Sequence, residues 1–203
     1  MVSILRKNMV ITYQGENYFR FQAGTLTLLL DPTNGRSFRG ANIVLNTLRP
    51  SFIEEPKESN EDASPFWTDH QGEYEVGGIE IQGISAESTS ALEKTVYRFV
   101  MDGITVVVLG HISEELSPRV QEVASGADIL IVPGGKKPYL GAPQVAKLVR
   151  QAAPGIVIVS LFGGDPKSFL KEFGKQKYEI QEKFVIKKKD IKPGAMEVVC
   201  LKA

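Results

Sequence analysis

Cysteine and histidine are scarce in this chain. Its 203 residues include one cysteine, Cys200, and two histidines, His70 and His111. A single cysteine cannot form a disulfide within the chain, and it cannot build a zinc site from several thiolates. Cys200 lies in the apolar run MEVVCL, which is typical of a small buried side chain. Any metal site therefore has to be built from His70, His111 and carboxylates.

A net charge and a long apolar run are also missing. The 24 basic residues and 24 acidic residues leave a formal net charge of zero, so we expect no global attraction to nucleic acid or to an anionic membrane. No run approaches the roughly 18 apolar residues of a membrane span. The first residues, MVSILRKNMVITYQG, lack the apolar core and cleavage site of a signal peptide. We expect a cytoplasmic protein with no nucleic-acid or membrane partner.

Short strands dominate the first half of the sequence. Runs rich in β-branched and aromatic residues, separated by glycine-containing turns, predict strands within 9–14, 17–24, 25–32, 41–47, 72–86 and 95–110. The segment 48–71 is polar, contains three prolines and shows no apolar period, so we expect a long loop there.

Helices and buried strands alternate in the second half. The patterns predict helices at 117–125, 142–154 and 165–175, strands at 126–135 and 155–164, and a strand pair within 184–201 around a Lys-Pro-Gly turn. A β-rich half followed by this alternation is not the pattern of one doubly wound sheet. It favours two mixed sheets packed face to face with helices outside.

The order of these elements resembles the metallo-β-lactamase fold, in particular its short single-domain Zn-dependent hydrolases. The matching strings span nearly the whole chain in the family's order: ITYQGENYFRFQAGTLTLLLDP, NIVLNT, GEYEVGGIEIQGI, YRFVMDGITVVVLG, ADILIVPGG, QVAKLVRQAAPGIVIV and FVIKKKDIKPGAMEVVCL. The resemblance implies an α/β fold: a four-layer αββα sandwich of two mixed β-sheets, formed by a single domain over residues 1–203.

The metal motif that this resemblance implies is not present. The family carries T-H-x-H-x-D-H after an apolar strand, where imidazoles and a carboxylate hold zinc ions that acidify a bound water. Here the strand and its threonine occur as NIVLNT, but LRPSFI follows. The positions that the resemblance assigns to metal ligands are Leu48, Pro50, Phe52, Ile53, Ser88, His111 and Leu161. We expect Leu48, Pro50, Phe52 and Leu161 to fill the former metal cavity.

His111 can bind a metal, but it stands where the family has a bridging aspartate. A bridging carboxylate offers two anionic oxygens to two cations, whereas a neutral imidazole offers one nitrogen. Its ordinary role at a strand end is that of a hydrogen-bonded or capping residue. The aspartate that matches Asp31 is mainly structural in the family and orients the metal-binding loop.

Two functional hypotheses remain open. The favoured one is a non-catalytic protein that has lost its zinc site, holds no cofactor and binds an unknown protein or small molecule. Exposed sheet edges near the C-terminal strand pair make a homo-oligomer conceivable. The alternative is a metal-dependent hydrolase with zinc held by a reduced or rebuilt site, for which the candidates are Asp31, Asp69, His70 and His111.

Overall fold

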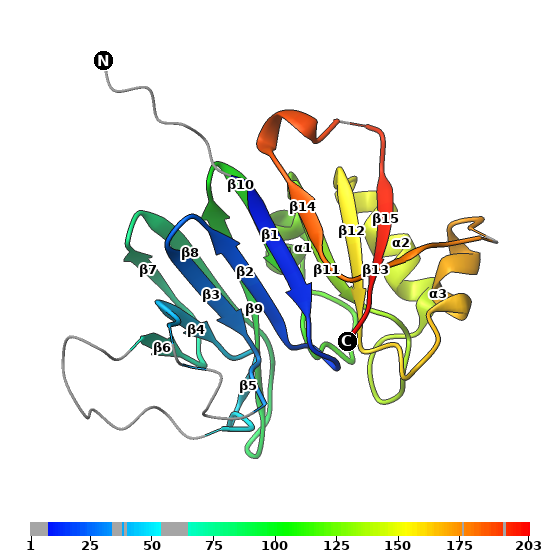
Figure 1. Cartoon of the computed structure of the whole chain (residues 1–203). Helices are drawn as coiled ribbons and strands as arrows, with labels where there is room; N and C mark the ends of the chain where they lie inside the picture. Colours follow the sequence, from blue (N-terminus) through cyan, green and yellow to red (C-terminus); the bar gives the residue numbers. More distant parts are fainter. Residues whose placement is uncertain (1–7, 34–37, 39, 54–64, 176, 193) are drawn as a thin grey trace.

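Two mixed β-sheets pack face to face in the computed structural model, which describes residues 8–33, 38, 40–53, 65–175, 177–192 and 194–203 (Figure 1). The six-stranded sheet has the order β14–β1–β2–β3–β4–β6. Its strands are β1 (Met9–Tyr13), β2 (Phe19–Ala23), β3 (Leu26–Leu30), β4 (Ile43–Leu45), β6 (Phe66–Thr68) and β14 (Phe184–Ile186).

The nine-stranded sheet has the order β13–β15–β12–β11–β10–β9–β8–β7, and a short β5 pairs with β9 beside this path. Its strands are β5 (Leu48–Arg49), β7 (Gly72–Val76), β8 (Ile79–Ser88), β9 (Glu93–Met101), β10 (Ile104–Val108), β11 (Ile129–Pro133), β12 (Ile156–Ser160), β13 (Ile180–Gln181) and β15 (Glu197–Leu201).

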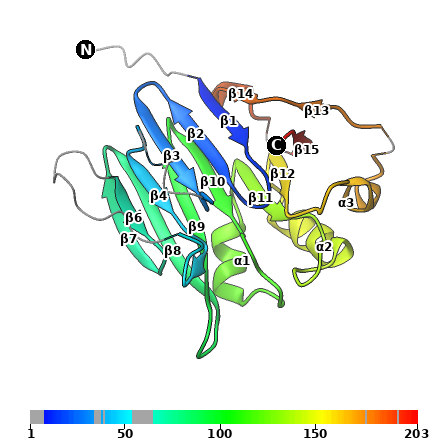
Figure 2. The ribbon, with the colours of Figure 1, turned by 60° about the horizontal axis from the view of Figure 1, so that its bottom comes forward.

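Helices cover the outer face of the nine-stranded sheet (Figure 2). They are α1 (Pro118–Ala124), α2 (Ala142–Ala152) and α3 (Lys167–Glu172), and a 3₁₀ turn occupies Lys188–Asp190. The α2 helix faces the sheet with a stripe that includes Val145 and Val149, as its apolar period predicts. All three α-helices in the described part of the chain lie on this side. None of the described helices is long and apolar enough to cross a membrane.

Alternating side chains form two buried cores. One lies between the sheets and takes every second residue of the strands, such as Ile11 from β1 and Phe99 from β9. The other lies between the nine-stranded sheet and the helices. The strands β11 and β12 are parallel neighbours that are buried on both faces, which explains their uninterrupted apolar sequence. The predicted sandwich of two mixed sheets is confirmed.

Two local predictions are wrong. The segment expected to be a loop at 48–71 contains the strands β5 and β6, while its part 54–64 lies outside the described residues. The strands predicted within 184–201 do not form a hairpin, because β14 pairs with β1 in one sheet and β15 pairs with β12 in the other. Both errors have one cause: strand pairing over long sequence separations does not show in a local apolar pattern.

Candidate functional site

Three strands of the sandwich deliver buried polar side chains to one edge. Asp31 follows β3, Thr47 lies just beyond β4, and His111 lies just beyond β10; all three residues are at most 3 % exposed. Asp31 Oδ1 accepts a hydrogen bond from the Thr47 N–H at 2.6 Å, and Asp31 Oδ2 accepts one from the Thr47 hydroxyl at 2.6 Å. The carboxylate thus holds the first residue of the chain segment in which the family carries its metal ligands.

The same carboxylate is linked to the far side of the sandwich. Asn17 Nδ2 donates to Asp31 Oδ2 at 2.6 Å, and Asn17 Oδ1 accepts from the Ser160 hydroxyl at 2.8 Å. Ser160 ends β12 and is fully buried. Asn17 was not among the predicted site residues, because a single asparagine at the start of a predicted strand gives no signal that its side chain is buried.

The His111 ring extends this chain of hydrogen bonds. Its Nδ1 lies 2.8 Å from Thr47 Oγ1. Since the threonine hydroxyl has one proton and gives it to Asp31, the imidazole is the donor in this contact and carries its proton on Nδ1. The ring also packs edge-on against Phe52 and Tyr139, with centroid distances of 5.8 and 5.3 Å. His111 is therefore a buried, hydrogen-bonded residue at a strand end.

Glycine is required immediately before this histidine. Gly110 has φ +62°, and a Cβ placed there would lie 2.7 Å from the Cβ of Thr47. A side chain at this position would push Thr47 away from Asp31 and His111, besides straining the backbone. In the string LGH, close packing against Thr47 therefore explains the glycine, and hydrogen bonding explains the histidine.

Burial keeps the imidazole of His111 neutral. Desolvation lowers the pKa of His111 below its usual 6.5 and outweighs the nearby carboxylate of Asp31, which raises it; the ammonium of Lys94 also lowers it. In the unfolded chain the imidazole regains its ordinary pKa, so the unfolded state binds more protons between the two values. The contribution of His111 to stability is complete above pH 6.5 and is lost as the pH falls from there through its pKa in the folded protein.

The free energy of unfolding should accordingly decrease as the pH drops below 6.5, and part of that decrease should vanish in a His111→Asn variant. Asparagine keeps a donor near Thr47 but does not titrate. Urea unfolding at pH 8, 6.5 and 5.5 measures the effect, with His70→Asn, whose side chain is 48 % exposed, as the matched control. An unchanged pH slope in His111→Asn would contradict this assignment.

A buried ion pair secures the loop that carries His111. Glu87 accepts hydrogen bonds from Lys94 Nζ at 2.6 Å, from the Ser113 N–H at 2.5 Å, from the Ser113 hydroxyl at 2.7 Å and from the Glu114 N–H at 2.9 Å. Burial raises the pKa of Glu87, but these four hydrogen bonds outweigh it and leave the pKa below its usual 4.5. The β8–β9 hairpin and the loop after β10 are joined through this carboxylate.

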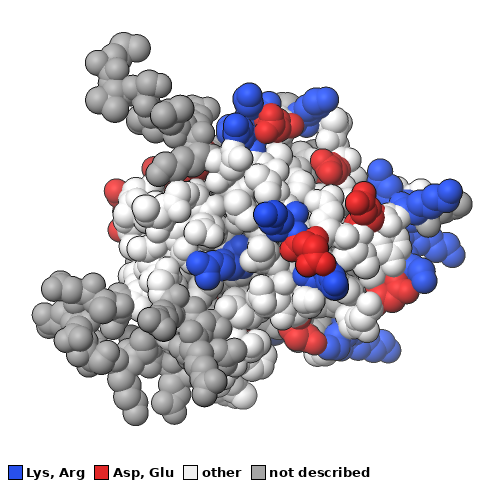
Figure 3. All heavy atoms as spheres, in the orientation of Figure 1, with Lys and Arg blue, Asp and Glu red and all other residues white. Residues whose placement is uncertain are grey.

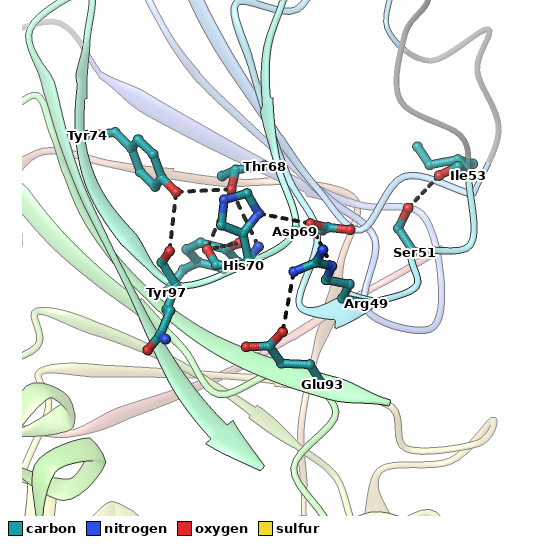
Figure 4. Close-up of polar contacts among 10 residues, drawn as sticks. Arg49, Ser51, Ile53, Thr68, Asp69, His70, Tyr74, Glu93 and Tyr97 are labelled. Carbon is teal, nitrogen blue, oxygen red and sulfur yellow. Dashed lines mark hydrogen bonds and ion pairs between the residues drawn. The ribbon is translucent and has the colours of Figure 1, made fainter. Parts of the chain in front are cut away.

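A second polar cluster lies nearer the surface (Figure 4). Arg49 stands between two carboxylates, with Nε 4.0 Å from Asp69 Oδ1 and Nη1 3.7 Å from Glu93 Oε2. The His70 Nδ1 lies 3.1 Å from the same oxygen of Asp69, and the Tyr97 hydroxyl donates to the His70 carbonyl at 3.2 Å. Arg49 and Glu93 meet because β5 pairs with β9 in that register.

A pocket of about 650 Å³ opens beside this cluster. Figure 1 shows β5 and the β8–β9 hairpin, which contribute to its lining, at one edge of the sandwich. It is lined by three segments: Arg49, Pro50, Ser51, Phe52 and Ile53; Asp69; and Ser88, Thr89, Ser90, Ala91, Leu92 and Glu93. Four of the positions that the resemblance assigns to metal ligands therefore face one cavity.

The expectation that apolar side chains fill this cavity is wrong for Pro50 and Phe52, and neither Leu48 nor Leu161 lines it. Leu48 and Leu161 are buried, but Pro50 is exposed and Phe52 is 64 % exposed. The pairing of β5 with β9 turns Leu48 inward, after which the chain runs along the rim of the pocket. Phe52 touches His111 by one edge and leaves most of its ring in solvent.

The donor set does not fit the metal that the family implies. Leu48, Pro50, Phe52, Ile53 and Leu161 carry no metal-binding atom in their side chains. His70 contacts Asp69, whereas His111 contacts Thr47, so the two histidines belong to different clusters. Within the residues that the structure describes, no three His, Cys, Asp or Glu side chains are placed to hold one ion.

Comparisons with known proteins agree with this architecture. A family model described as a β-lactamase superfamily domain matches residues 10–159. No curated protein sequence shows a significant match. A structure from Thermotoga maritima, named as a candidate Zn-dependent hydrolase of the metallo-β-lactamase superfamily, superposes with a TM-score of 0.73 at 20 % identity and covers 95 % of this chain and 98 % of its own.

Two further structures are similar at lower identity. The metallo-β-lactamase fold protein YhfI from Bacillus subtilis has a TM-score of 0.64 at 13 % identity, over 96 % of both chains. A protein from Parabacteroides distasonis, named as a candidate metal-dependent hydrolase, has a TM-score of 0.64 at 15 % identity, over 97 % of this chain and 94 % of its own. At these identities the structures establish the fold alone. The structures show that this chain has the metallo-β-lactamase fold, and the family model shows that it belongs to the β-lactamase superfamily.

Proposed function

We propose that this protein binds an organic ligand or a protein segment in the pocket beside Phe52 and does not use the metal chemistry of its family. One observation carries the proposal. The pocket stays open at the family's ligand positions, yet the side chains that reach it from those positions are Pro50, Phe52, Ile53 and Ser88. An open pocket whose lining offers no set of metal donors at those positions is suited to binding rather than to activating a water molecule.

The second candidate function is metal-dependent hydrolysis, and the names of the similar structures from Thermotoga maritima and Parabacteroides distasonis favour it. It requires His70 and His111 to share an ion with Asp31 or Asp69. The imidazole of His111 is buried against Thr47, and that of His70 is half exposed beside Asp69. For both imidazoles to bind one ion, the His111–Thr47 contact and the His70–Asp69 contact would both have to be broken.

Metal content separates the two functions. Protein purified without chelator should contain far less than one zinc, manganese or iron ion per chain, because no set of three donors converges on one point. Elemental analysis measures this, and competition against a chromogenic chelator measures the affinity for added zinc. His70→Ala and His111→Ala should leave that affinity unchanged. A tightly held ion in stoichiometric amount, lost in both variants, would establish the hydrolase instead.

The proposal also covers the location, the partner and the oligomeric state of the protein. We infer a single cytoplasmic domain over residues 1–203 whose partner is a protein or a small molecule. Basic and acidic side chains are intermingled on the face shown in Figure 3, which together with the zero net charge supports a partner other than nucleic acid. Ile180 and Val185 are exposed apolar residues on the edge strands β13 and β14, and they support a homo-oligomer.

A further inference from the structure

We propose that the pocket beside Phe52 selects a small organic cation, with the ligand's ammonium group taking the place between Asp69 and Glu93. This inference rests on the proposed binding function and names the chemical class of its ligand. It starts from the charges that line the cavity, which are Arg49, Asp69 and Glu93. Two carboxylates face one guanidinium, so the lining carries an excess negative charge that attracts a cation and repels an anion.

Arg49 offsets the charge of one of the two carboxylates without being locked to either of them. Its nitrogens lie 4.0 Å from Asp69 and 3.7 Å from Glu93, beyond direct hydrogen-bond distance. Arg49 donates no side-chain hydrogen bond to any residue that the structure describes. Its side chain is 57 % exposed, whereas those of Asp69 and Glu93 are 11 % and 23 % exposed. The carboxylates are recessed, while the arginine can move into solvent at low cost.

An ammonium group fits the position that Arg49 occupies. Asp69 and Glu93 both lie within 4.0 Å of the guanidinium, so a cation that displaces Arg49 enters the electrostatic field of both carboxylates. It can form shorter, charge-assisted hydrogen bonds than the long contacts of Arg49. Arg49 then competes with the ligand for the two carboxylates. In an anion site, by contrast, the arginine itself would bind the ligand.

The rest of the lining suits an uncharged body attached to that cation. Phe52 presents a largely exposed aromatic ring, next to Ile53 and Leu92. Ser88 adds a hydroxyl group to the lining from the β8–β9 hairpin, while the Thr89 hydroxyl is hydrogen-bonded to Leu92 within the turn. The carboxylates attract an organic cation through their charge, and an aromatic ring attracts it through the quadrupole of its face. The volume of about 650 Å³ lies within the range of small-molecule sites.

Three matched probes test the charge preference: 2-phenylethylamine, its neutral counterpart 2-phenylethanol, and the anion 3-phenylpropionate. Their affinities are measured at low ionic strength by calorimetry and by shifts of protein amide resonances. We expect the amine to bind at least about tenfold more tightly than the alcohol, since the charge-assisted contacts add to the same apolar contact. The anion should bind more weakly than either.

Three isosteric or shortened variants then assign the contacts. Asp69→Asn and Glu93→Gln should each weaken amine binding about fivefold or more, because each removes one carboxylate charge while keeping the shape. Arg49→Gln should strengthen amine binding, because it removes the competing cation. Glu75→Gln, on β7 and outside the pocket lining, is the control and should change nothing.

Each contrary result overturns the inference in a recognisable way. If the alcohol binds as tightly as the amine, the carboxylates do not select the ligand. If 3-phenylpropionate binds best and Arg49→Gln abolishes its binding, the pocket is an anion site. If no probe binds, the cation class is wrong. None of these outcomes restores a metal site, and only stoichiometric metal in the same samples would overturn the proposed function itself.

Discussion

An Asp31→Asn variant is expected to lose about 3 kcal/mol of its free energy of unfolding, because buried hydrogen bonds to a charged group contribute about 1.5–3 kcal/mol each. The Asp31 carboxylate accepts from the Thr47 N–H, the Thr47 hydroxyl and the Asn17 amide. An asparagine keeps one acceptor oxygen and places an NH₂ group against the remaining donors. If Asn17 turned its amide over, Ser160 would have to give up its 2.8 Å hydrogen bond to Asn17 Oδ1 and donate to the Val132 carbonyl at 3.3 Å instead.

Urea unfolding of the wild-type and variant proteins at pH 8 measures this loss. The matched control is Asp102→Asn in the turn between β9 and β10, where φ is +51°, a conformation that asparagine tolerates well. That substitution should change the free energy of unfolding by less than about 0.5 kcal/mol. If Asp31→Asn were equally mild, the Asp31–Thr47–His111 chain would not be the anchor of this edge of the sandwich.

The hydrogen bonds of Asp31 explain how this edge of the sandwich is held together by protein groups alone. Asp31 and Thr47 stabilise the ends of β3 and β4 by hydrogen bonds that need no metal. His111 completes the same chain from β10 and packs against Phe52 and Tyr139. The polar residues that remain at this edge are held by one another, so their retention is accounted for by stability.

The sequence alone was sufficient to predict the two-sheet sandwich and part of the candidate site. Apolar alternation located most of the strands, and the order of elements identified the two-sheet arrangement. The string LRPSFI after Thr47 showed that the metal motif is absent, because residue type alone decides whether a side chain can bind zinc. These conclusions depend on local patterns and on chemical identity, both of which are present in one sequence.

The pocket and its charges could not be predicted in this way. Arg49, Asp69 and Glu93 meet only because β5 pairs with β9 and β6 ends beside them. β5 is two residues long and lies in a segment that reads as a loop. Whether Phe52 fills a cavity or borders one depends on the direction of that short strand, which a hydrophobic residue type does not specify. Such contacts are set by tertiary pairing rather than by propensity.

The second large effect is expected at the ion pair that secures the His111 loop. Replacing Glu87 by Gln should lower the free energy of unfolding by about 3 kcal/mol, since breaking a buried pair leaves an uncompensated charge. Lys94 and Glu87 have side chains that are 11 % and 13 % exposed, so solvent does little to replace the lost partner. The ammonium would keep the Ser113 hydroxyl, at 2.5 Å, and at most one neutral amide oxygen, so its charge would have no anionic partner at this position.

The pH dependence of this loss separates a charge effect from a packing effect. The pKa of Glu87 is lowered in the folded protein, so its contribution to stability is complete above its ordinary pKa of 4.5 and disappears as the pH falls through the lowered value. The gap between wild type and Glu87→Gln should therefore be largest at neutral pH and shrink in acid. Glu182→Gln, which breaks the exposed pair with Lys202, should cost less than about 0.5 kcal/mol at any pH. A gap at Glu87 that stayed constant down to pH 3 would mean that shape, and not charge, joins the β8–β9 hairpin to the loop that carries His111.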